Sequence, residues 1–168
     1  ERTNKKSLSA LQIKIHVTEK QPARNLPEIT AIIKGAALST AVKEKSIAVF
    51  QTLARAEAKI HGISADKVHF HEVGAVDAIV DIVGSVIALE MLGVEQIFSS
   101  PLPLGKGWIK ASHGWIPLPA PAAAEIIRER GIPCYGISLE EETVTPTGAA
   151  LLGTLSSGFI PLPPMIIE

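Results

Sequence analysis

The segment from Val76 to Leu92 constrains the fold more than any other part of this sequence. Almost every residue in it is apolar or small, and the ionisable groups that precede Glu90 are Asp77 and Asp81. Such a composition predicts a helix that is buried over most of its surface and ends at Gly93. Other elements must pack around this helix, which requires a domain with a substantial core.

The other segments alternate between helical and extended patterns. Helical periodicity, with caps or stop residues at the ends, occurs in Pro27–Lys34, Thr40–His61, Pro121–Arg130 and from Thr145 or Thr147 to Leu155. Extended patterns occur in Leu11–Val17, Val68–His71, Gln96–Ser100 and Ile132–Ile137, with Gly105–Ala111 as a hairpin arm and Ser112–Pro119 as a loop. The sequence therefore predicts an α/β or α+β fold with a mixed sheet and one buried apolar helix.

Length and composition limit the functional classes. The 168 residues suit a single domain over residues 1–168, and 46% of them are hydrophobic. The net charge is -1, from 16 basic and 17 acidic residues, so charge does not favour a nucleic-acid partner. The sequence has no apolar run that suits a membrane span. Its single cysteine, Cys134, fits a cytoplasmic compartment and a small buried side chain.

Two histidines lie just before the apolar helix. If this segment is extended, His69 and His71 share one face, because strand side chains alternate, and Phe70 points to the core. A His-x-His pair beside Glu72 provides ligands that suit nickel, zinc or copper. The alternative is a pair of solvated histidines, and the pair alone does not decide between the two.

Asp77 and Asp81 strengthen the metal interpretation. They are four residues apart and therefore lie on one face of the predicted helix. A carboxylate on a buried apolar helix is costly without a cation or several donors, so Asp81 is expected to meet a partner. Asp77 also has a structural explanation, since backbone N–H groups stabilise a carboxylate in a first helical turn. The candidate metal ligands are His69, His71, Glu72, Asp77 and Asp81.

Common enzyme motifs do not fit this sequence. A His-x-His-x-Asp-His hydrolase site would need Asp at Val73, and a His-Glu-x-x-His zinc site would need His at Ala75. The sequence also has no Gly-Lys-Ser/Thr phosphate loop and no Gly-x-Ser-x-Gly elbow. The common nucleotide-binding and hydrolase functions are therefore disfavoured.

Three blocks of the sequence together resemble the LarC family. The first is residues 68–84, which contain His69-Phe70-His71-Glu72 and both aspartates. The second is His113-Gly114 followed by Pro117 and Pro119–Ala122, and the third is Glu142 followed by Thr145–Ala150. The blocks have the order and spacing found in that family.

The resemblance implies part of a nickel insertion enzyme, of the lyase or chelatase type. Its substrate would be pyridinium-3,5-bisthiocarboxylic acid mononucleotide, and its product the nickel-pincer cofactor. The resemblance also implies that the full-length protein consumes CTP with Mn²⁺ or Mg²⁺ at a site outside this chain. The sequence lacks the family's Ser-Gly and Gly-Asp rich opening motif and its C-terminal CTP-handling module, so we expect it to be an internal fragment.

The turn Thr145-Pro146-Thr147-Gly148 is a candidate phosphate site. A helix start with hydroxyl caps exposes N–H groups, so Thr145, Thr147 and Gly148 could hold the phosphate of the mononucleotide precursor. An ordinary N-cap is the alternative, and the turn by itself favours it. His113 lies in a Gly- and Pro-rich loop and is a further candidate substrate contact, with a solvated side chain as the alternative.

Three functions fit these observations. The chain is part of the nickel insertion enzyme, a nickel-binding delivery module without chemistry, or a structural domain that assembles a homo-oligomer. The first requires binding of nickel and of the precursor, the second nickel alone, and the third neither. The family resemblance favours the first.

Overall fold

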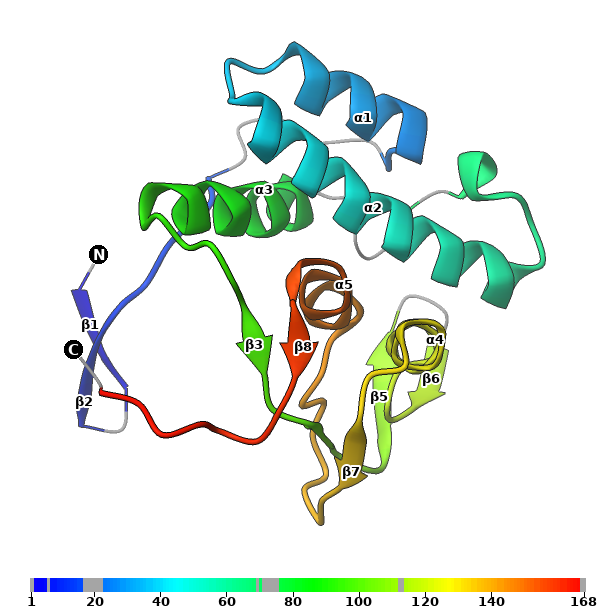
Figure 1. Ribbon diagram of the computed structural model, residues 1–168. Helices are drawn as coiled ribbons and strands as arrows, with labels where there is room; N and C mark the ends of the chain where they lie inside the picture. Colours follow the sequence, from blue (N-terminus) through cyan, green and yellow to red (C-terminus); the bar gives the residue numbers. More distant parts are fainter. Residues whose placement is uncertain are drawn as a thin grey trace.

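The structure is a computed structural model that describes residues 2–5, 7–16, 23–68, 70, 76–111 and 114–166 (Figure 1). Its helices are α1 (Leu26–Gly35), α2 (Thr40–His61), the short 3-10 helix η1 (Ala65–Lys67), α3 (Val76–Met91), α4 (Pro121–Arg130) and α5 (Pro146–Leu155). The five α-helices predicted from the sequence are confirmed, with nearly the same bounds. Among the described residues, no helix combines the length and the apolar character needed to cross a membrane.

Helix α2 is the centre of the helical core. It packs against the other four α-helices, and Figure 1 shows α1 on one side of it and α3, α4 and α5 on the other. Its start is capped by Ser39, whose hydroxyl accepts a hydrogen bond from the N–H of Val42 at 3.1 Å. Its end is Gly62, in the left-handed conformation that glycine adopts most easily, with φ of 64°. Its most enclosed apolar side chains are Val49, Phe50, Leu53, Ala54 and Ala56.

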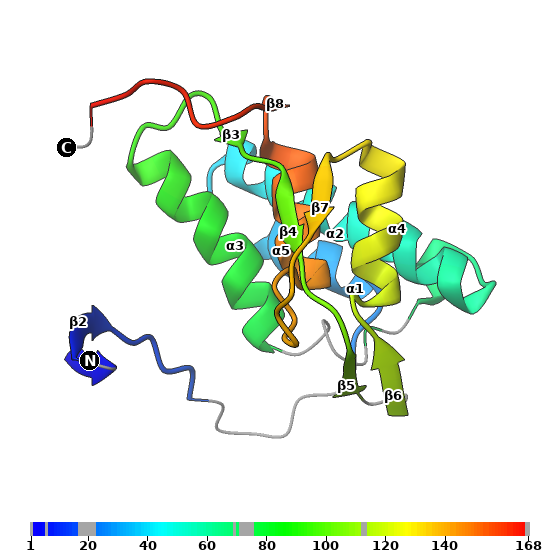
Figure 2. The ribbon, with the colours of Figure 1, turned by 90° about the horizontal axis from the view of Figure 1, so that it is seen from below.

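Helix α3 is buried on one face only, which corrects the prediction of a largely buried helix. The buried face carries Ala78, Ile82 and Val86, which are spaced four residues apart. Val80, on another face, is 40% exposed. The helix packs chiefly against α2 and more lightly against α5, and Figure 2 shows it at the edge of the helices. Helix α3 therefore has more apolar surface than its neighbours in the described part of the chain cover.

The strands form four separate pairs, and not one mixed sheet, within the described residues. Two pairs are parallel: β3 (Phe98–Ser99) with β8 (Gly158–Phe159), and β4 (Leu102–Leu104) with β7 (Cys134–Gly136). Two pairs are antiparallel: β1 (Arg2–Lys5) with β2 (Leu8–Leu11), and β5 (Trp108–Ala111) with β6 (Gly114–Pro117). Helices combined with parallel and antiparallel strands confirm the α/β or α+β class.

The N-terminal segment differs most from its prediction. The prediction of a strand at Leu11–Val17 is wrong for residues 12–16, which form no regular secondary structure. Residue 17 lies outside the described residues. Leu11 and Ile13 are 80% and 85% exposed, and both views show the β1–β2 hairpin apart from the helices (Figures 1 and 2). Alternating apolar residues form a half-buried strand only where their apolar side chains pack against a core. The described elements provide no such core here.

Two smaller predictions are also corrected. The loop expected at Ser112–Pro119 contains β6, in which Ile116 pairs in register with Ile109 of β5. Both isoleucines are partly buried and Ile116 packs against the core, so apolar contact outweighs the turn-forming residues nearby. Cys134 lies in β7 and is exposed, so it is not the small buried side chain that the sequence predicts.

Charged side chains join α4 to α2. Glu125 on α4 accepts hydrogen bonds from Arg128 at 2.7 Å and from Lys59 on α2 at 2.8 Å. These hydrogen bonds lower the pKa of Glu125 from its ordinary 4.5 to about 2, and the bond from Arg128 contributes more than the bond from Lys59. Arg55 and Glu129 form a second pair between the two helices at 2.9 Å. The basic members of these pairs are exposed, so the apolar contacts between the helices supply most of the stability.

Candidate functional site

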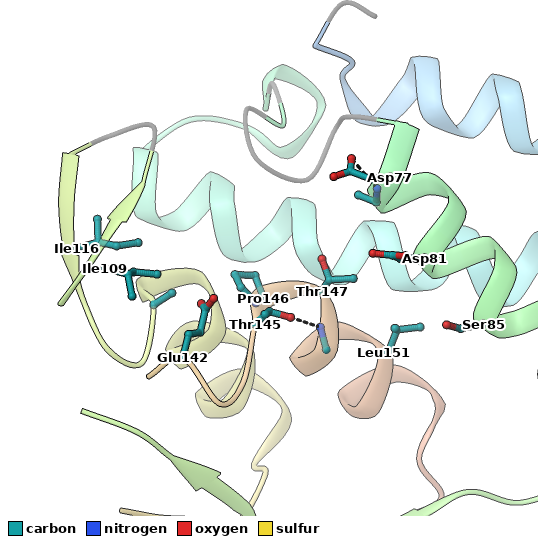
Figure 3. A pocket seen from close by; sticks show the side chains of 13 residues that line it. Asp77, Asp81, Ser85, Ile109, Ile116, Glu142, Thr145, Pro146, Thr147 and Leu151 are labelled. Carbon is teal, nitrogen blue, oxygen red and sulfur yellow. Dashed lines mark hydrogen bonds between the residues drawn. The ribbon is translucent and has the colours of Figure 1, made fainter. Parts of the chain in front are cut away.

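A cavity of about 520 Å³ lies between α3, the start of α5 and the β5–β6 hairpin (Figure 3). Its polar lining is formed by Asp77, Asp81, Ser85, Glu142, Thr145 and Thr147. The rest of its lining is formed by Ala78, Ile109, Ile116, Ala120, Pro146, Gly148 and Leu151. Residues from all three sequence blocks therefore meet at one place, although long stretches of chain separate the blocks.

Asp77 and Asp81 form an acidic wall of this cavity on α3. Asp77 lies in the first turn, where its carboxylate accepts a hydrogen bond from the N–H of Ala78 at 2.9 Å. Asp81 lies one turn further along, and both carboxylates are on the side of α3 that faces α5 (Figure 3). Both residues are exposed, so the prediction that Asp81 is a charge on a buried helix is wrong. Its place in an open cavity now favours a ligand role.

The first turn of α5 forms the facing wall. Thr145 is the N-cap: its hydroxyl accepts a hydrogen bond from the N–H of Gly148 at 3.1 Å, and its carbonyl accepts one from Ala149 at 2.9 Å. A Cβ on residue 148 would lie 3.3 Å from the Thr145 hydroxyl oxygen, so glycine suits this tight cap. Pro146 has no N–H, and the N–H of Gly148 is bonded to the Thr145 hydroxyl. Among residues 146–148, the N–H that the cap does not use is therefore that of Thr147. The turn offers fewer donors to a phosphate than the sequence predicts.

Glu142 is a cavity residue to which the sequence assigned no role. It lies on the loop between β7 and α5, and Figure 3 shows it on the side of Thr145 away from α3. The available signal was its position three residues before Thr145 in the third block. Ile109 and Ile116 were missed for a different reason, because the second arm of their hairpin was expected to be a loop.

The histidine half of the predicted site, His69, His71, Glu72 and His113, lies outside the described residues. The neighbouring Phe70 is 2% exposed, and its ring packs edge-on against Phe50 with centroids 6.1 Å apart. This confirms that Phe70 points into the core. In the described ranges, no group of three or more His, Cys, Asp or Glu side chains could hold a metal ion. A metal at the two aspartates therefore needs further ligands.

Known proteins resemble this chain over its whole length. The family described as nickel insertion protein matches residues 1–168. A relative from Geobacter sulfurreducens, provisionally named a nickel insertion protein, is 49% identical over 167 residues, which cover 99% of this chain and 42% of the relative. A relative from Desulfitobacterium hafniense, named pyridinium-3,5-bisthiocarboxylic acid mononucleotide nickel insertion protein, is 48% identical over 164 residues, which cover 98% of this chain and 40% of the relative. No solved structure matches the chain.

The chain spans less than half the length of these relatives. The matched region nevertheless includes all three blocks whose residues meet at the cavity. The match to the family extends over every residue, and it agrees with the resemblance noted from the sequence. The chain belongs to the nickel insertion protein family.

Proposed function

We propose that this chain is the part of a nickel insertion enzyme that brings nickel to pyridinium-3,5-bisthiocarboxylic acid mononucleotide. The observation that carries the proposal is the cavity in which Asp77 and Asp81 stand opposite the first turn of α5. The name of the Desulfitobacterium hafniense relative identifies this mononucleotide as the acceptor of nickel in that protein. The matching sequence supports the same substrate here.

The proposed metal ligands are Asp77 and Asp81, together with His69, His71 and Glu72. Carboxylate oxygen and imidazole nitrogen bind Ni²⁺ without the strong preference that sulfur ligands show for softer ions. Such a site holds the ion and still releases it to the thiocarboxylate sulfur atoms of the precursor. Cys134 is not among the residues that line the cavity. Among the described residues, the cavity therefore offers carboxylate ligands and no thiolate.

The charge of the cavity suits a cation. Asp77, Asp81 and Glu142 are acidic, and none of the described residues that line the cavity is a lysine or arginine. This charge favours Ni²⁺ and the cationic pyridinium ring, and it disfavours a phosphate at the centre of the cavity. We assign the phosphate to the first turn of α5, which Thr145, Thr147 and Gly148 form, with His113 as the proposed positive partner.

Two further features belong to the proposal. The family resemblance supports a lyase or chelatase type of reaction that consumes CTP with Mn²⁺ or Mg²⁺ at a site outside this chain. The single cysteine supports a cytoplasmic location. Neither feature is required for the cavity to bind nickel and the mononucleotide.

Calorimetric titration of the chain with nickel, in the absence and in the presence of the mononucleotide, tests the proposal. We expect nickel to bind, and the mononucleotide to strengthen that binding, because both ligands occupy one cavity. Nickel binding that does not respond to the mononucleotide would indicate a delivery module. Binding of neither ligand would indicate a structural domain and would refute the proposal.

A further inference from the structure

The loop between β7 and α5 is fastened to the chain that follows β4. The N–H of Ile137 donates a hydrogen bond to the carbonyl of Leu104 at 2.9 Å. The N–H of Lys106 donates one to the carbonyl of Leu139 at 2.9 Å. These bonds lie on both sides of Gly105, so the loop and the β4–β5 connection form one unit.

Thr143 completes this attachment with its side chain. Its hydroxyl donates a hydrogen bond to the carbonyl of Pro103 at 2.6 Å and accepts one from the N–H of Gly105 at 3.0 Å. Gly105 is buried, and a Cβ there would overlap the carbonyl oxygen of Glu141 and lie 3.0 Å from that of Leu139. The loop is therefore in close contact with the backbone beneath it.

The fastened loop presents one acidic side chain to the cavity. Glu140, Glu141 and Glu142 are consecutive, but only Glu142 of the three lines the cavity, and the other two are exposed. Thr143 follows Glu142 directly, so the two hydrogen bonds of the Thr143 hydroxyl fix the backbone from which the Glu142 side chain extends.

Glu142 does not form a metal-binding group with the two aspartates, Asp77 and Asp81, among the described residues. Figure 3 shows Glu142 apart from the two aspartates, beyond Thr145. A carboxylate that lies apart from the metal is suited to accept hydrogen bonds from hydroxyl groups. Sites for nucleotides use acidic side chains on ribose hydroxyls in this way.

We propose that Glu142 binds a ribose hydroxyl of the mononucleotide, and that Thr143 is the positioning residue that holds Glu142 in place. This inference rests on the proposed function, because the ribose belongs to the proposed substrate. It places the metal at the α3 end of the cavity and the sugar at the β7–α5 loop. The ring that joins the metal and the sugar then lies between the two ends.

The first test compares Glu142→Ala with Glu140→Ala, the matched control on the same loop. Each variant is titrated with the mononucleotide and with its 2′,3′-dideoxyribose analogue. The wild type and Glu140→Ala should prefer the ribose form by about tenfold or more, as a hydrogen bond to a charged group provides. Glu142→Ala should lose that preference and keep its affinity for nickel alone.

The outcomes separate this inference from the function on which it rests. A wild type that does not bind the mononucleotide would overturn the proposed function and this inference with it. A wild type that binds it, with an unchanged ribose preference in Glu142→Ala, would overturn this inference alone.

The second test examines Thr143 by a double-mutant cycle. Thr143→Val should weaken binding of the mononucleotide several-fold, whereas Thr143→Ser, which keeps the hydroxyl, should not. In the Glu142→Ala background, Thr143→Val should cause no further loss of affinity, because its effect passes through Glu142. An equal loss in both backgrounds would overturn the positioning role, and so would a normal affinity of folded Thr143→Val. If thermal denaturation shows that Thr143→Val does not fold, Thr143→Ala replaces it in the same cycle.

Discussion

Asp81 on α3 and Thr147 in the first turn of α5 line the same cavity from facing walls (Figure 3). Their proximity depends on α2, which packs against both α3 and α5. The hydroxyl of Thr52 on α2 lies 3.0 Å from that of Thr154, near the other end of α5. The central helix therefore sets the spacing of the two walls, and the cavity is a consequence of the helical core.

Asp81→Asn should separate ligand binding from stability. Because Asp81 is exposed in the cavity, we expect the variant to unfold with a free energy within about 0.5 kcal/mol of the wild type. Its nickel affinity should fall by about tenfold or more, as is typical when a group near a bound metal is lost. Thermal denaturation with and without nickel measures both effects.

The matched control for this variant is Asp66→Asn, which changes an exposed aspartate on η1 outside the cavity. It should change neither the melting temperature nor the stabilisation by nickel. A large loss of apo stability in Asp81→Asn, with undiminished stabilisation by nickel, would show that Asp81 is a structural residue.

Thr145→Ala should destabilise the start of α5. The variant loses the side chain that accepts the N–H of Gly148, and loss of such a cap typically costs about 1 kcal/mol in the free energy of unfolding. Thr145→Ser keeps the hydroxyl and should be close to the wild type. Urea denaturation measures the difference, and equal stability of the alanine and serine variants would contradict the capping role.

Phe70→Ala should cause a large loss of stability. The buried ring contacts Phe50, and truncation of a buried phenylalanine typically costs about 3–5 kcal/mol in the free energy of unfolding. Phe98→Ala is the control, since Phe98 is 51% exposed and its truncation should cost much less. Similar losses in the two variants by urea denaturation would show that Phe70 does not anchor its segment to the core.

The lowered pKa of Glu125 makes the free energy of unfolding depend on pH in a predictable direction. The folded protein lowers this pKa from 4.5 to about 2, through Arg128 first and Lys59 second, so protonation of Glu125 favours the unfolded chain. Its contribution to stability is present above pH 4.5 and is lost as the pH falls from 4.5 toward 2. The stability difference between wild type and Glu125→Gln should therefore narrow over this range.

Denaturation of both proteins over a pH series checks this expectation. Glu44→Gln, at an exposed position on α2, is the control and should show no such narrowing. A wild-type advantage over Glu125→Gln that stays constant from roughly pH 6 to pH 3 would contradict the assignment.

Helix positions could be predicted because the signals that define them are local. Ser39 and Gly62 bound α2, and Thr145 caps α5, through hydrogen bonds within a few residues of each helix end. The burial of α3 could not be predicted in the same way. Its sequence is apolar on several sides, and only the packing of α2 and α5 decides which side is covered.

The candidate site was predicted in part, for the same physical reason. Asp77 and Asp81 share a helical face because of their spacing, and this could be read directly from the sequence. Their proximity to Thr147 depends on contacts between helices that are distant along the chain. The role proposed for Glu142 depends on the attachment of its loop to Gly105, which no local pattern reveals.

The measurement that tests the central claim most directly is a calorimetric titration of nickel into the chain saturated with the mononucleotide. It compares the wild type with the double variant Asp77→Asn/Asp81→Asn. We predict that the double variant still binds the mononucleotide and that its nickel affinity falls by at least about tenfold. Equal nickel affinities in the two proteins would contradict the claim that this cavity is where nickel meets its acceptor.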